Sequence, residues 1–354
     1  MTERRVRLES APEPDGLPSA WSMLPRDWAQ LGHRGSPGAL FSRVQRIATW
    51  NEHGPDLGKA ARALLAQTDT TLPLIDETAL SADGSRRCVL VTSDGKKIEA
   101  VHMPRAVKNP RVTLCLSSQI GCAMACTFCA TGSMGIVRNL SAGEIVGEVL
   151  SIMRAYGPKN GHSLNVVFMG MGEPLHNATH VRRAVEVLCH PEGIGMSPNR
   201  IVVSTSGLVP AIEKFASWPV RPLLAVSVNA TTDETRSRIM PVNRSYGLAE
   251  LKAALLAFPV RPGERILLEY VLLRGENDSD DDAARLADFA RGLSHNVNLV
   301  PLNEHELTSH RAPDDAWVRC FAAKLESAGC LCTVRKNRGR DIRGACGQLV
   351  QSEV

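Results

Sequence analysis

The sequence has few aromatic residues, no long apolar run and almost no excess of charge. Phe, Trp and Tyr make up 4% of the 354 residues, so a base-stacking RNA-recognition module is not suggested. No run of about 18 apolar residues occurs, and residues 1–16 carry charges without an apolar core, which argues against a membrane span and a signal peptide. We therefore expect a cytoplasmic protein without membrane association.

The composition indicates a folded globular chain. Hydrophobic residues make up 44% and charged residues 22%, which excludes a disordered, collagen-like or heptad-repeat protein. The net charge is +4, from 41 basic and 37 acidic residues, and this alone does not identify a nucleic-acid binder. The segment 335–343, RKNRGRDIR, carries a net charge of +4 by itself, from five basic residues and one acid. It predicts a local anion-binding surface, or else a solvated basic loop.

The sequence contains ten cysteines, although a disulfide framework is not expected in the cytoplasm. Cys122, Cys126 and Cys129 follow a C-x3-C-x2-C spacing in GCAMACTFCATG, directly after a predicted strand. Thiolates spaced in this way can hold a compact inorganic cluster, and three cysteines on a four-iron cube leave one iron open to a small molecule. A structural zinc site is the alternative, with Cys115 or His102 as a further ligand.

The pattern of the chain changes near residue 110. Residues 1–85 contain two amphipathic helical patterns, at 38–51 and 56–67, and we interpret this region as a small helical module that binds RNA. Residues 86–110 are interpreted as a hairpin and linker, because two apolar runs flank a Ser-Asp-Gly turn.

Residues 111–350 alternate between two patterns. Short β-branched runs predict six strands, at 112–118, 164–171, 199–207, 223–230, 265–273 and 296–302. Amphipathic patterns predict helices at 141–157, 180–190, 248–258, 277–293 and 314–329. This alternation predicts an α/β fold with a parallel sheet, either doubly wound or an incomplete barrel. In both architectures ligands bind at the carboxyl ends of the strands.

A second motif, FMGMGEPL at residues 168–175, follows the second predicted strand of this region. It lacks the third glycine of a dinucleotide-binding turn, so that interpretation is rejected. Gly170 and Gly172 could let the backbone approach the amino group of a bound ligand, or could merely allow a helix to start close to the strand. Because the cysteine motif lies one strand away, we prefer the ligand interpretation.

The C-x3-C-x2-C motif at a strand end resembles the radical S-adenosylmethionine (SAM) superfamily, in which the open iron binds the amino and carboxylate groups of SAM. Together with MPVNRSYGL, LEYVLL and RKNRGRDIRGACGQL, it resembles the radical SAM adenine methyltransferases of ribosomal and transfer RNA. These enzymes methylate C2 of adenine, and a sister branch methylates C8 and confers antibiotic resistance. The similarity runs from about residue 86 to 350, whereas residues 1–85 match only through FSRVQRIATW. It implies a partial (β/α)6 radical SAM barrel, a [4Fe-4S] cluster and two SAM molecules per turnover.

The resemblance also implies roles for single residues. The three cysteines of the motif hold the cluster, Cys346 carries the methyl group, Cys115 is the resolving thiol that forms a disulfide with it, and Glu99 is the general base. SAM contacts are expected at Gly172, Glu173, Ser204, Ser227, Val228, Asn229 and Asn303. Asn229 departs from the pattern, because many members have a histidine in a Ser-Leu-His tripeptide; asparagine still offers a donor and an acceptor.

Direct polar methylation is unavailable to adenine C2, which is electron-poor between two ring nitrogens. The resemblance implies that one SAM methylates Cys346, that a radical from a second SAM removes a hydrogen from this methyl group, and that the methylene radical adds to the base. Glu99 then removes the ring proton, and attack by Cys115 on the Cys346 sulfur frees the product. We expect Arg343 and Arg340 to favour the Cys346 thiolate by their charge.

The sequence therefore predicts an enzyme that methylates C2 of an adenine in 23S rRNA, in tRNA or in both. The first alternative is methylation at C8, although the Glu-Pro pair at 173–174 favours C2. The second is a catalytically silent RNA-binding iron-sulfur protein, against which the presence of both Cys115 and Cys346 argues. The expected partners are RNA and an electron donor such as flavodoxin, and we expect a monomer.

Overall fold

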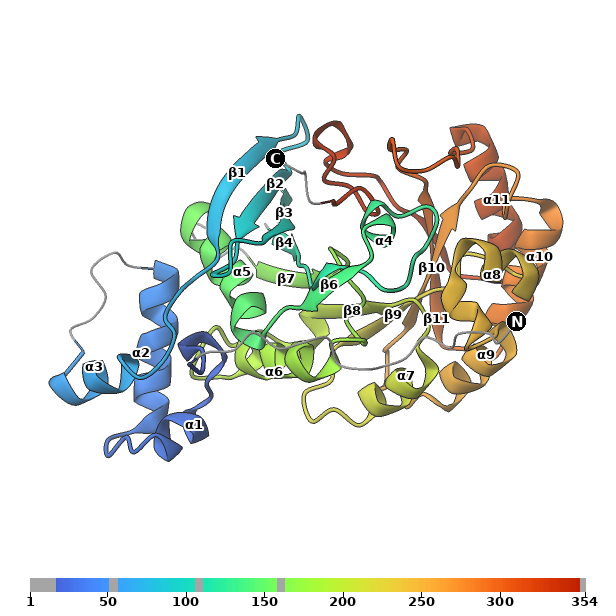
Figure 1. The fold of residues 1–354 in the computed structure, drawn as a ribbon. Coiled ribbons are helices and arrows are strands. Elements are labelled where there is room, and N and C mark those ends of the chain that lie inside the picture. Colours follow the sequence, from blue (N-terminus) through green and yellow to red (C-terminus); the bar gives the residue numbers. More distant parts are fainter. Residues whose placement is uncertain (1–16, 51–56, 106–110, 158–162, 351–354) are drawn as a thin grey trace, which may run out of the picture.

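The computed structural model describes residues 17–50, 57–105, 111–157 and 163–350. Within these residues a ten-stranded mixed sheet runs through the molecule (Figure 1). In their order across the sheet, the strands are β1 (Leu74–Leu80), β2 (Arg86–Val91), β3 (Lys97–Arg105), β4 (Arg111–Cys115), β7 (Ser163–Phe168), β8 (Ile201–Thr205), β9 (Leu223–Ser227), β10 (Ile266–Leu272), β11 (His295–Pro301) and β12 (Cys332–Val334).

Six strands, β4 and β7 to β11, are parallel and lie side by side in their order along the chain. The α-helices between and after them are α4 (Ala130–Ser133), α5 (Ala142–Tyr156), α6 (Ala178–Cys189), α7 (Val209–Ala216), α8 (Asp233–Ile239), α9 (Leu248–Ala257), α10 (Asp280–Ala290) and α11 (Asp315–Ser327). A doubly wound sheet would reverse its strand order at one point, and this sheet does not. The six predicted strands and the partial (β/α)6 barrel are confirmed.

Three antiparallel strands extend the barrel sheet beyond β4. Strands β2 and β3 form the predicted hairpin around the Ser-Asp-Gly turn. Strand β1 was not predicted, because its sequence, LIDETAL, lacks a regular apolar alternation and most of its side chains are exposed. It is an edge strand, where acidic side chains such as Asp76 and Glu77 discourage pairing with another chain. Because β1 pairs with β2, the sheet crosses the predicted module boundary at residue 85.

The amino-terminal helices pack against α5 and α6. They are the 3-10 helix η1 (Ala20–Ser22), α1 (Pro25–Gln30), α2 (Pro37–Trp50) and α3 (Lys59–Leu65). Trp28 and Phe41 are fully buried in the same core as the barrel strands. Arg183 of α6 donates to the Ser22 carbonyl at 2.7 Å and forms an ion pair with Asp27. Both helices predicted in this region are present, as α2 and α3, and α1 is additional.

The predicted capping box opens α5. Ser141 Oγ accepts a hydrogen bond from the Glu144 N–H at 3.1 Å, and the Glu144 carboxylate accepts one from the Ser141 N–H at 2.8 Å. Helix α10 begins in the same way at Ser279, with three acidic residues in its first turn. The other predicted barrel helices are present as α6, α9 and α11. None of the helices in the described ranges is long and apolar enough to cross a membrane.

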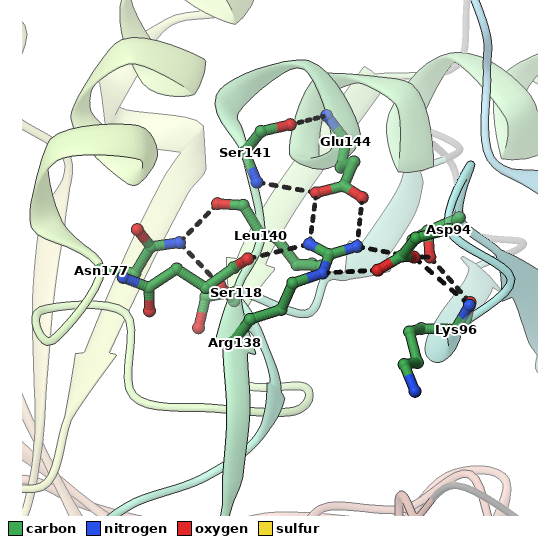
Figure 2. A network of polar contacts seen from close by, with 10 residues as sticks. Asp94, Lys96, Ser118, Arg138, Leu140, Ser141, Glu144 and Asn177 are labelled. Atoms are coloured by element: carbon green, nitrogen blue, oxygen red, sulfur yellow. Dashed lines mark hydrogen bonds and ion pairs between the residues drawn. The ribbon is translucent and has the colours of Figure 1, made fainter. Parts of the chain in front are cut away.

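Arg138 joins three parts of the fold, as Figure 2 shows. It lies on β6 (Ile136–Asn139), which pairs with β5 (Gln119–Gly121), and these two strands flank the cysteine motif. Its guanidinium donates to Asp94, in the turn between β2 and β3, at 2.9 and 3.0 Å. It also donates to Glu144, at the start of α5, at 2.7 and 2.9 Å. The hydrogen bonds from Arg138 lower the pKa of Asp94 to about 2.

Asn177 makes a second link beside Arg138 (Figure 2). Its Nδ2 donates to the carbonyl oxygens of Ser118 at 2.7 Å and Leu140 at 2.8 Å. These bonds fix the residues before α6 to the two chain segments that enter and leave the β5–β6 pair.

Replacing Arg138 by methionine is expected to lower the free energy of unfolding by about 3 kcal/mol, because Glu144, 11% exposed, loses its cation in a largely desolvated site. Chemical denaturation measures this change. Arg182→Met is the control, because its ion pair with Glu186 is long, at 3.8 Å, and half-exposed. We expect the control to change stability by less than about 0.5 kcal/mol. Equal effects of the two substitutions would contradict the role of Arg138.

Candidate active site

The three cysteines of the motif lie on the loop between β5 and β6 and line one cavity, termed the cluster cavity. At the start of the loop Gly121 has a φ of +74°, and a Cβ there would lie 1.9 Å from the carbonyl oxygen of Gly135, so only glycine fits. The N–H of Cys122 donates to the same oxygen at 2.8 Å. The base of the loop is thereby closed, and Cys126 and Cys129 are held on the same turn.

The surroundings of these thiols suit an iron-sulfur cluster. Burial raises the pKa of each thiol above its ordinary value, so the thiolates need a positively charged partner, which the irons of a cluster supply. In the part of the chain that the structure describes, no three His, Cys, Asp or Glu side chains converge on a single ion. In a four-iron cube each sulfur binds a different iron, so such convergence is not required. The zinc alternative needed Cys115 or His102, and neither lines this cavity.

Six of the seven predicted SAM contacts line the cluster cavity. They are Gly172, Glu173, Ser204, Ser227, Asn229 and Asn303. Ser204 and Ser227 lie near the carboxyl ends of β8 and β9, where ligands of such barrels bind. Glu173 is buried, and its two carboxylate oxygens accept from the N–H groups of Leu175 at 3.1 Å and Ser206 at 2.7 Å. These bonds fix the Glu173 carboxylate at the cavity wall.

The glycines of the second motif allow two strand ends to approach closely. At Gly172, with a φ of +98°, a Cβ would lie 2.6 Å from the Cβ of Gln119. At Gly170 a Cβ would lie 2.6 Å from the carbonyl oxygen of Leu116, which accepts the Gly170 N–H at 3.0 Å. The glycines therefore hold the turn after β7 against the end of β4. They do not begin a helix, because α6 starts only at residue 178.

Val228 is the predicted contact that lies apart from the cavity. Its side chain is fully buried in the core, and its N–H and C=O are both hydrogen-bonded within the protein. Its neighbour Asn229 has a φ of +53°, a left-handed conformation that asparagine tolerates better than most residues. The Asn229 side chain accepts from the Val271 N–H at 2.8 Å and donates to the Met240 sulfur at 3.2 Å. Asparagine at this position therefore braces the turn after β9.

Arg236, on the short helix α8, is fully buried and has a role that no sequence motif indicates. Its guanidinium donates to the carbonyl oxygens of Ser206, Ser227 and Val228 at 2.6 to 3.0 Å, and to Asn243 Oδ1 at 3.0 Å. These bonds connect the segments after β8 and β9 that carry predicted SAM contacts. No pattern marks this residue, because an arginine on a short helix is usually exposed.

An open groove of about 910 Å³ adjoins the cluster cavity and is termed the basic groove. Cys115, at the end of β4, lines this groove, and Cys346 lines both the groove and the cluster cavity. Both cysteines are free thiols. Burial raises the pKa of the Cys115 thiol, the nearby Cys346 sulfur raises it further, and the Arg335 guanidinium opposes both effects. The structure thus brings together two cysteines that are 231 positions apart in the chain (346 − 115).

Glu99, the predicted base, lines neither cavity. Its carboxylate, on β3, is 1% exposed and accepts from Arg87 Nη1 at 2.6 Å and from the Val350 N–H at 3.0 Å. Burial raises the pKa of Glu99, and Arg87 opposes this rise. Leu349 lines the basic groove and is the direct neighbour of Val350. Glu99 therefore has no contact with the groove while its bond to Val350 is in place.

The positive charge near Cys346 comes from Arg335, not from the predicted arginines. Arg343 is exposed, where it pairs with Glu306, and neither Arg343 nor Arg340 lines either cavity. Arg335 lines both, and the Cys346 sulfur raises the pKa of the Arg335 guanidinium against the effect of its burial. Arg343 and Arg340, the arginines predicted to act here, are close to Cys346 only along the chain. Arg335 lies farther away but is carried to the site by the short strand β12.

The loop after β11, residues 303–310, contacts both the cysteine motif and the segment of Cys346. Asn303 Nδ2 donates to the carbonyl oxygen of Cys346 at 3.0 Å. Thr308 Oγ1 donates to the carbonyl oxygen of Thr127, within the cysteine motif, at 3.1 Å. This loop, termed the bridging loop, therefore fixes the cysteine motif relative to Cys346.

His305 adds a bond from the bridging loop to the cysteine motif. Its Nδ1 accepts from the Leu307 N–H at 3.2 Å, so in the neutral ring Nε2 carries the hydrogen. Nε2 then donates to the carbonyl oxygen of Phe128, the residue before Cys129, at 3.2 Å. No sequence pattern marks His305, because its partners lie in a segment far away along the chain.

Replacing His305 by alanine is expected to increase the rate at which iodoacetamide alkylates Cys346 in the iron-free protein by about fivefold, because one hydrogen bond of about 1 kcal/mol is lost from the bridging loop. Peptide mass spectrometry of the Cys346 peptide measures this rate. His305→Gln keeps an N–H donor toward Phe128 and should restore the original rate. An unchanged rate in the alanine variant would show that His305 does not position this segment.

Comparisons with known proteins agree with the fold and with the cysteine motif. Residues 116–287 match the model of the radical SAM superfamily. The dual-specificity RNA methyltransferase RlmN of Syntrophotalea carbinolica is 45% identical over 295 residues, which cover 83% of this chain and 77% of that protein. The RlmN of an Anaeromyxobacter species is 43% identical over 349 residues, which cover 96% and 91% of the two chains.

A solved structure extends this similarity to three dimensions. The crystal structure of a radical SAM methyltransferase from Sphaerobacter thermophilus matches with a TM-score of 0.85 and 37% identity, over 94% of this chain and 99% of the other. Identity at this level over most of both chains establishes common membership. The chain therefore belongs to the family of radical SAM methyltransferases that includes the dual-specificity RNA methyltransferases RlmN.

Proposed function

We propose that this enzyme methylates C2 of an adenine in RNA, with 23S rRNA and tRNA as substrates, and that Cys346 carries the transferred carbon. The main support is that Cys346 lines both the cluster cavity and the basic groove. A carbon bound to its sulfur can be taken up on one side and delivered on the other without leaving the protein. The relatives named dual-specificity RNA methyltransferases support RNA as the acceptor.

A [4Fe-4S] cluster and SAM, at two molecules per turnover, are the cofactors of this family. When bound, they supply the methyl group and the radical chemistry that joins a carbon to an electron-poor position. Cys122, Cys126 and Cys129 are the proposed cluster ligands. The proposed SAM contacts are the six residues that line the cluster cavity, among which Glu173 is fixed in place by two backbone N–H groups.

Arg335 has a distinct task in this proposal. The sulfur of Cys346 must react as a thiolate to accept a methyl group, and a nearby guanidinium stabilises that negative charge. Arg335 is held for this by the Glu269 carboxylate at 3.9 Å and by the sulfur of Met169 at 3.4 Å. Because the Arg335 side chain is 26% exposed and Cys346 is partly buried, solvent weakens their attraction less than it would at the open surface.

Product release is assigned to Cys115 and Glu99. Once the carbon joins Cys346 to the base, the ring proton must leave, and the bond between carbon and sulfur must break. Cys115 faces the same groove as Cys346, so its thiolate can attack the Cys346 sulfur. A sulfur–sulfur bond forms, the carbon–sulfur bond breaks, and the carbon keeps that electron pair and takes up a proton to become the methyl group of the product. Glu99 can receive the ring proton only when Val350 and Leu349 move away from its carboxylate.

We also infer that the enzyme is a cytoplasmic monomer, that a flavodoxin-like protein reduces its cluster and that residues 1–85 contribute to RNA binding. These inferences rest on the composition of the chain and on the family resemblance. Light scattering on the purified protein tests the monomer, and reduction of the reconstituted cluster by flavodoxin tests the donor. Loss of RNA affinity on replacing Arg34 and Lys59, two exposed cations of this region, by alanine tests the binding role.

Nucleoside analysis tests the proposed reaction. Protein reconstituted without oxygen is incubated with SAM, a reductant and an unmodified 23S rRNA transcript or tRNA, and the digested RNA is compared with 2-methyladenosine and 8-methyladenosine standards. We expect 2-methyladenosine together with 5'-deoxyadenosine, and no methylated product from Cys346→Ala. The exposed Cys320 provides the control, as Cys320→Ala should act normally. 8-Methyladenosine would shift the assignment to C8, and RNA binding without any methylation would indicate a silent binding protein.

A further inference from the structure

The basic groove carries more positive charge than the proposed chemistry uses. Its lining includes five cations and one carboxylate, namely Arg105, Arg111, Arg335, Lys336, Arg338 and Asp83. Arg338 pairs with Asp83 at 3.6 Å and donates to its carbonyl oxygen at 3.0 Å. Arg335 faces Cys346 and Glu269. Three cations, Arg105, Arg111 and Lys336, remain without an assigned task.

Arg105 and Arg111 stand directly opposite each other. Arg105 ends β3 and Arg111 begins β4, and the antiparallel register pairs the two residues. Like charges in direct cross-strand positions destabilise a sheet, so the pair is unfavourable unless an anion lies between or above the two guanidinium groups. Both side chains are exposed, and among the described residues neither has a carboxylate or hydrogen-bond partner.

Lys336 lies on the other wall of the groove, next in the chain to Arg335. It is exposed and, in the described ranges, likewise makes no ion pair or hydrogen bond. Charge therefore lies on both sides of the opening, on β3 and β4 and on the segment after β12. An anion bound by both walls would lie over the cysteines that line the groove.

A phosphodiester chain is the ligand that fits this arrangement. The carboxylate of SAM is not the expected occupant, because none of the three cations lines the cluster cavity. A volume of about 910 Å³ exceeds the needs of a single small anion. Guanidinium groups bind phosphate through two parallel hydrogen bonds, and lysine binds it as a point charge.

We propose that Arg105, Arg111 and Lys336 bind the sugar-phosphate backbone of the RNA strand beside the target adenine. This inference rests on the proposed function, since it places the strand whose base reaches Cys346. Extruding a base from folded RNA costs a few kcal/mol, and phosphate contacts at the rim of the groove offset that cost. The three residues specify no sequence, because phosphates are common to all nucleotides.

RNA binding by the full-length protein tests this site without depending on catalysis. The dissociation constant for an unmodified 23S rRNA transcript is measured by filter binding at several salt concentrations. The slope of log affinity against log salt is negative, and each lost phosphate contact decreases its magnitude by about 0.7 to 0.9. For Arg105→Ala combined with Arg111→Ala we expect a decrease of about 1.4 to 1.8, and for Lys336→Ala a decrease of about 0.8. Circular dichroism and thermal melting confirm that each variant folds.

Matched variants separate a site from a general effect of charge. Lys214→Ala with Arg319→Ala removes two exposed cations from α7 and α11, outside the groove, and should leave the slope unchanged. Arg105→Lys with Arg111→Lys keeps the charge and should keep the slope. Unaltered binding in Arg105→Ala with Arg111→Ala, or an equal loss in the control pair, overturns the proposal. With either of these two outcomes, methylation of RNA by the original enzyme would still support the proposed function, so the failure of this site can be told apart from the failure of that function.

Discussion

Replacing Cys115 by alanine is expected to leave RNA covalently attached to the enzyme. The carbon joined to Cys346 can be released only when a second sulfur attacks the Cys346 sulfur, and Cys115 is the other cysteine among the described residues that lines the basic groove. Multiple turnover should be lost, and one RNA per protein should remain bound. A denaturing gel shows the adduct as a shifted band, and mass spectrometry of the digested band locates it at Cys346.

Cys88→Ala is the matched control for this experiment. Cys88 is also a buried strand cysteine, but it lies on β2 and lines neither cavity. What separates it from Cys115 is therefore its position, because the Cys88 thiol does not share a cavity with Cys346. We expect the control to release product normally. Normal release by Cys115→Ala would remove the resolving role of this cysteine, whereas trapping by both variants would point to a loss of packing.

The barrel strands were predictable because each is marked by an apolar pattern within a short stretch of sequence. Strands of a parallel sheet that are covered on both faces appear as continuous apolar runs, and all six runs became strands. Strands β1 and β12 were not predicted. Both lie at edges of the sheet and expose most of their side chains, so their sequences lack a continuous apolar run. The module boundary predicted at residue 85 did not take β1 into account. Strand β1 pairs with β2 and so joins the amino-terminal region to the hairpin.

The candidate site was predictable where a motif or a strand end fixes a residue, and not where distant segments meet. The three cysteines were predictable from their spacing, and Ser204 and Ser227 from the family resemblance, in agreement with their places near the ends of β8 and β9. Arg335 and the closed position of Glu99 depend on how the segment after β12 folds back. The Arg335 N–H donates to the Leu299 carbonyl at 2.8 Å, which extends the alignment of β12 along β11 and carries its side chain toward Cys346. Distance along the chain favoured Arg343, which the fold directs to solvent.

Glu99→Gln is expected to slow product release by about 10²- to 10⁴-fold, because glutamine cannot accept the ring proton. RNA should again accumulate on Cys346, but with Cys115 intact. Since Glu99 must be deprotonated to act, release by the original enzyme should slow as the pH falls through its pKa. Burial raises that pKa, so this decline should begin above the ordinary range of a glutamate. Rapid quenching of preformed adduct at a series of pH values measures the rate.

Arg87 is expected to determine the pH at which the rate of product release declines. Its guanidinium, 2.6 Å from Glu99, opposes the effect of burial, so Arg87→Met should raise the pKa of Glu99 further and move the decline to higher pH. Arg86→Met is the control, because the Arg86 guanidinium stacks over Tyr156 at 4.4 Å and is not bonded to Glu99. A decline that stays in place in Arg87→Met, or that persists in Glu99→Gln, would assign the titrating base to another group. A decline that moves only in Arg87→Met would show that the carboxylate buried behind Val350 becomes exposed to the adduct during turnover.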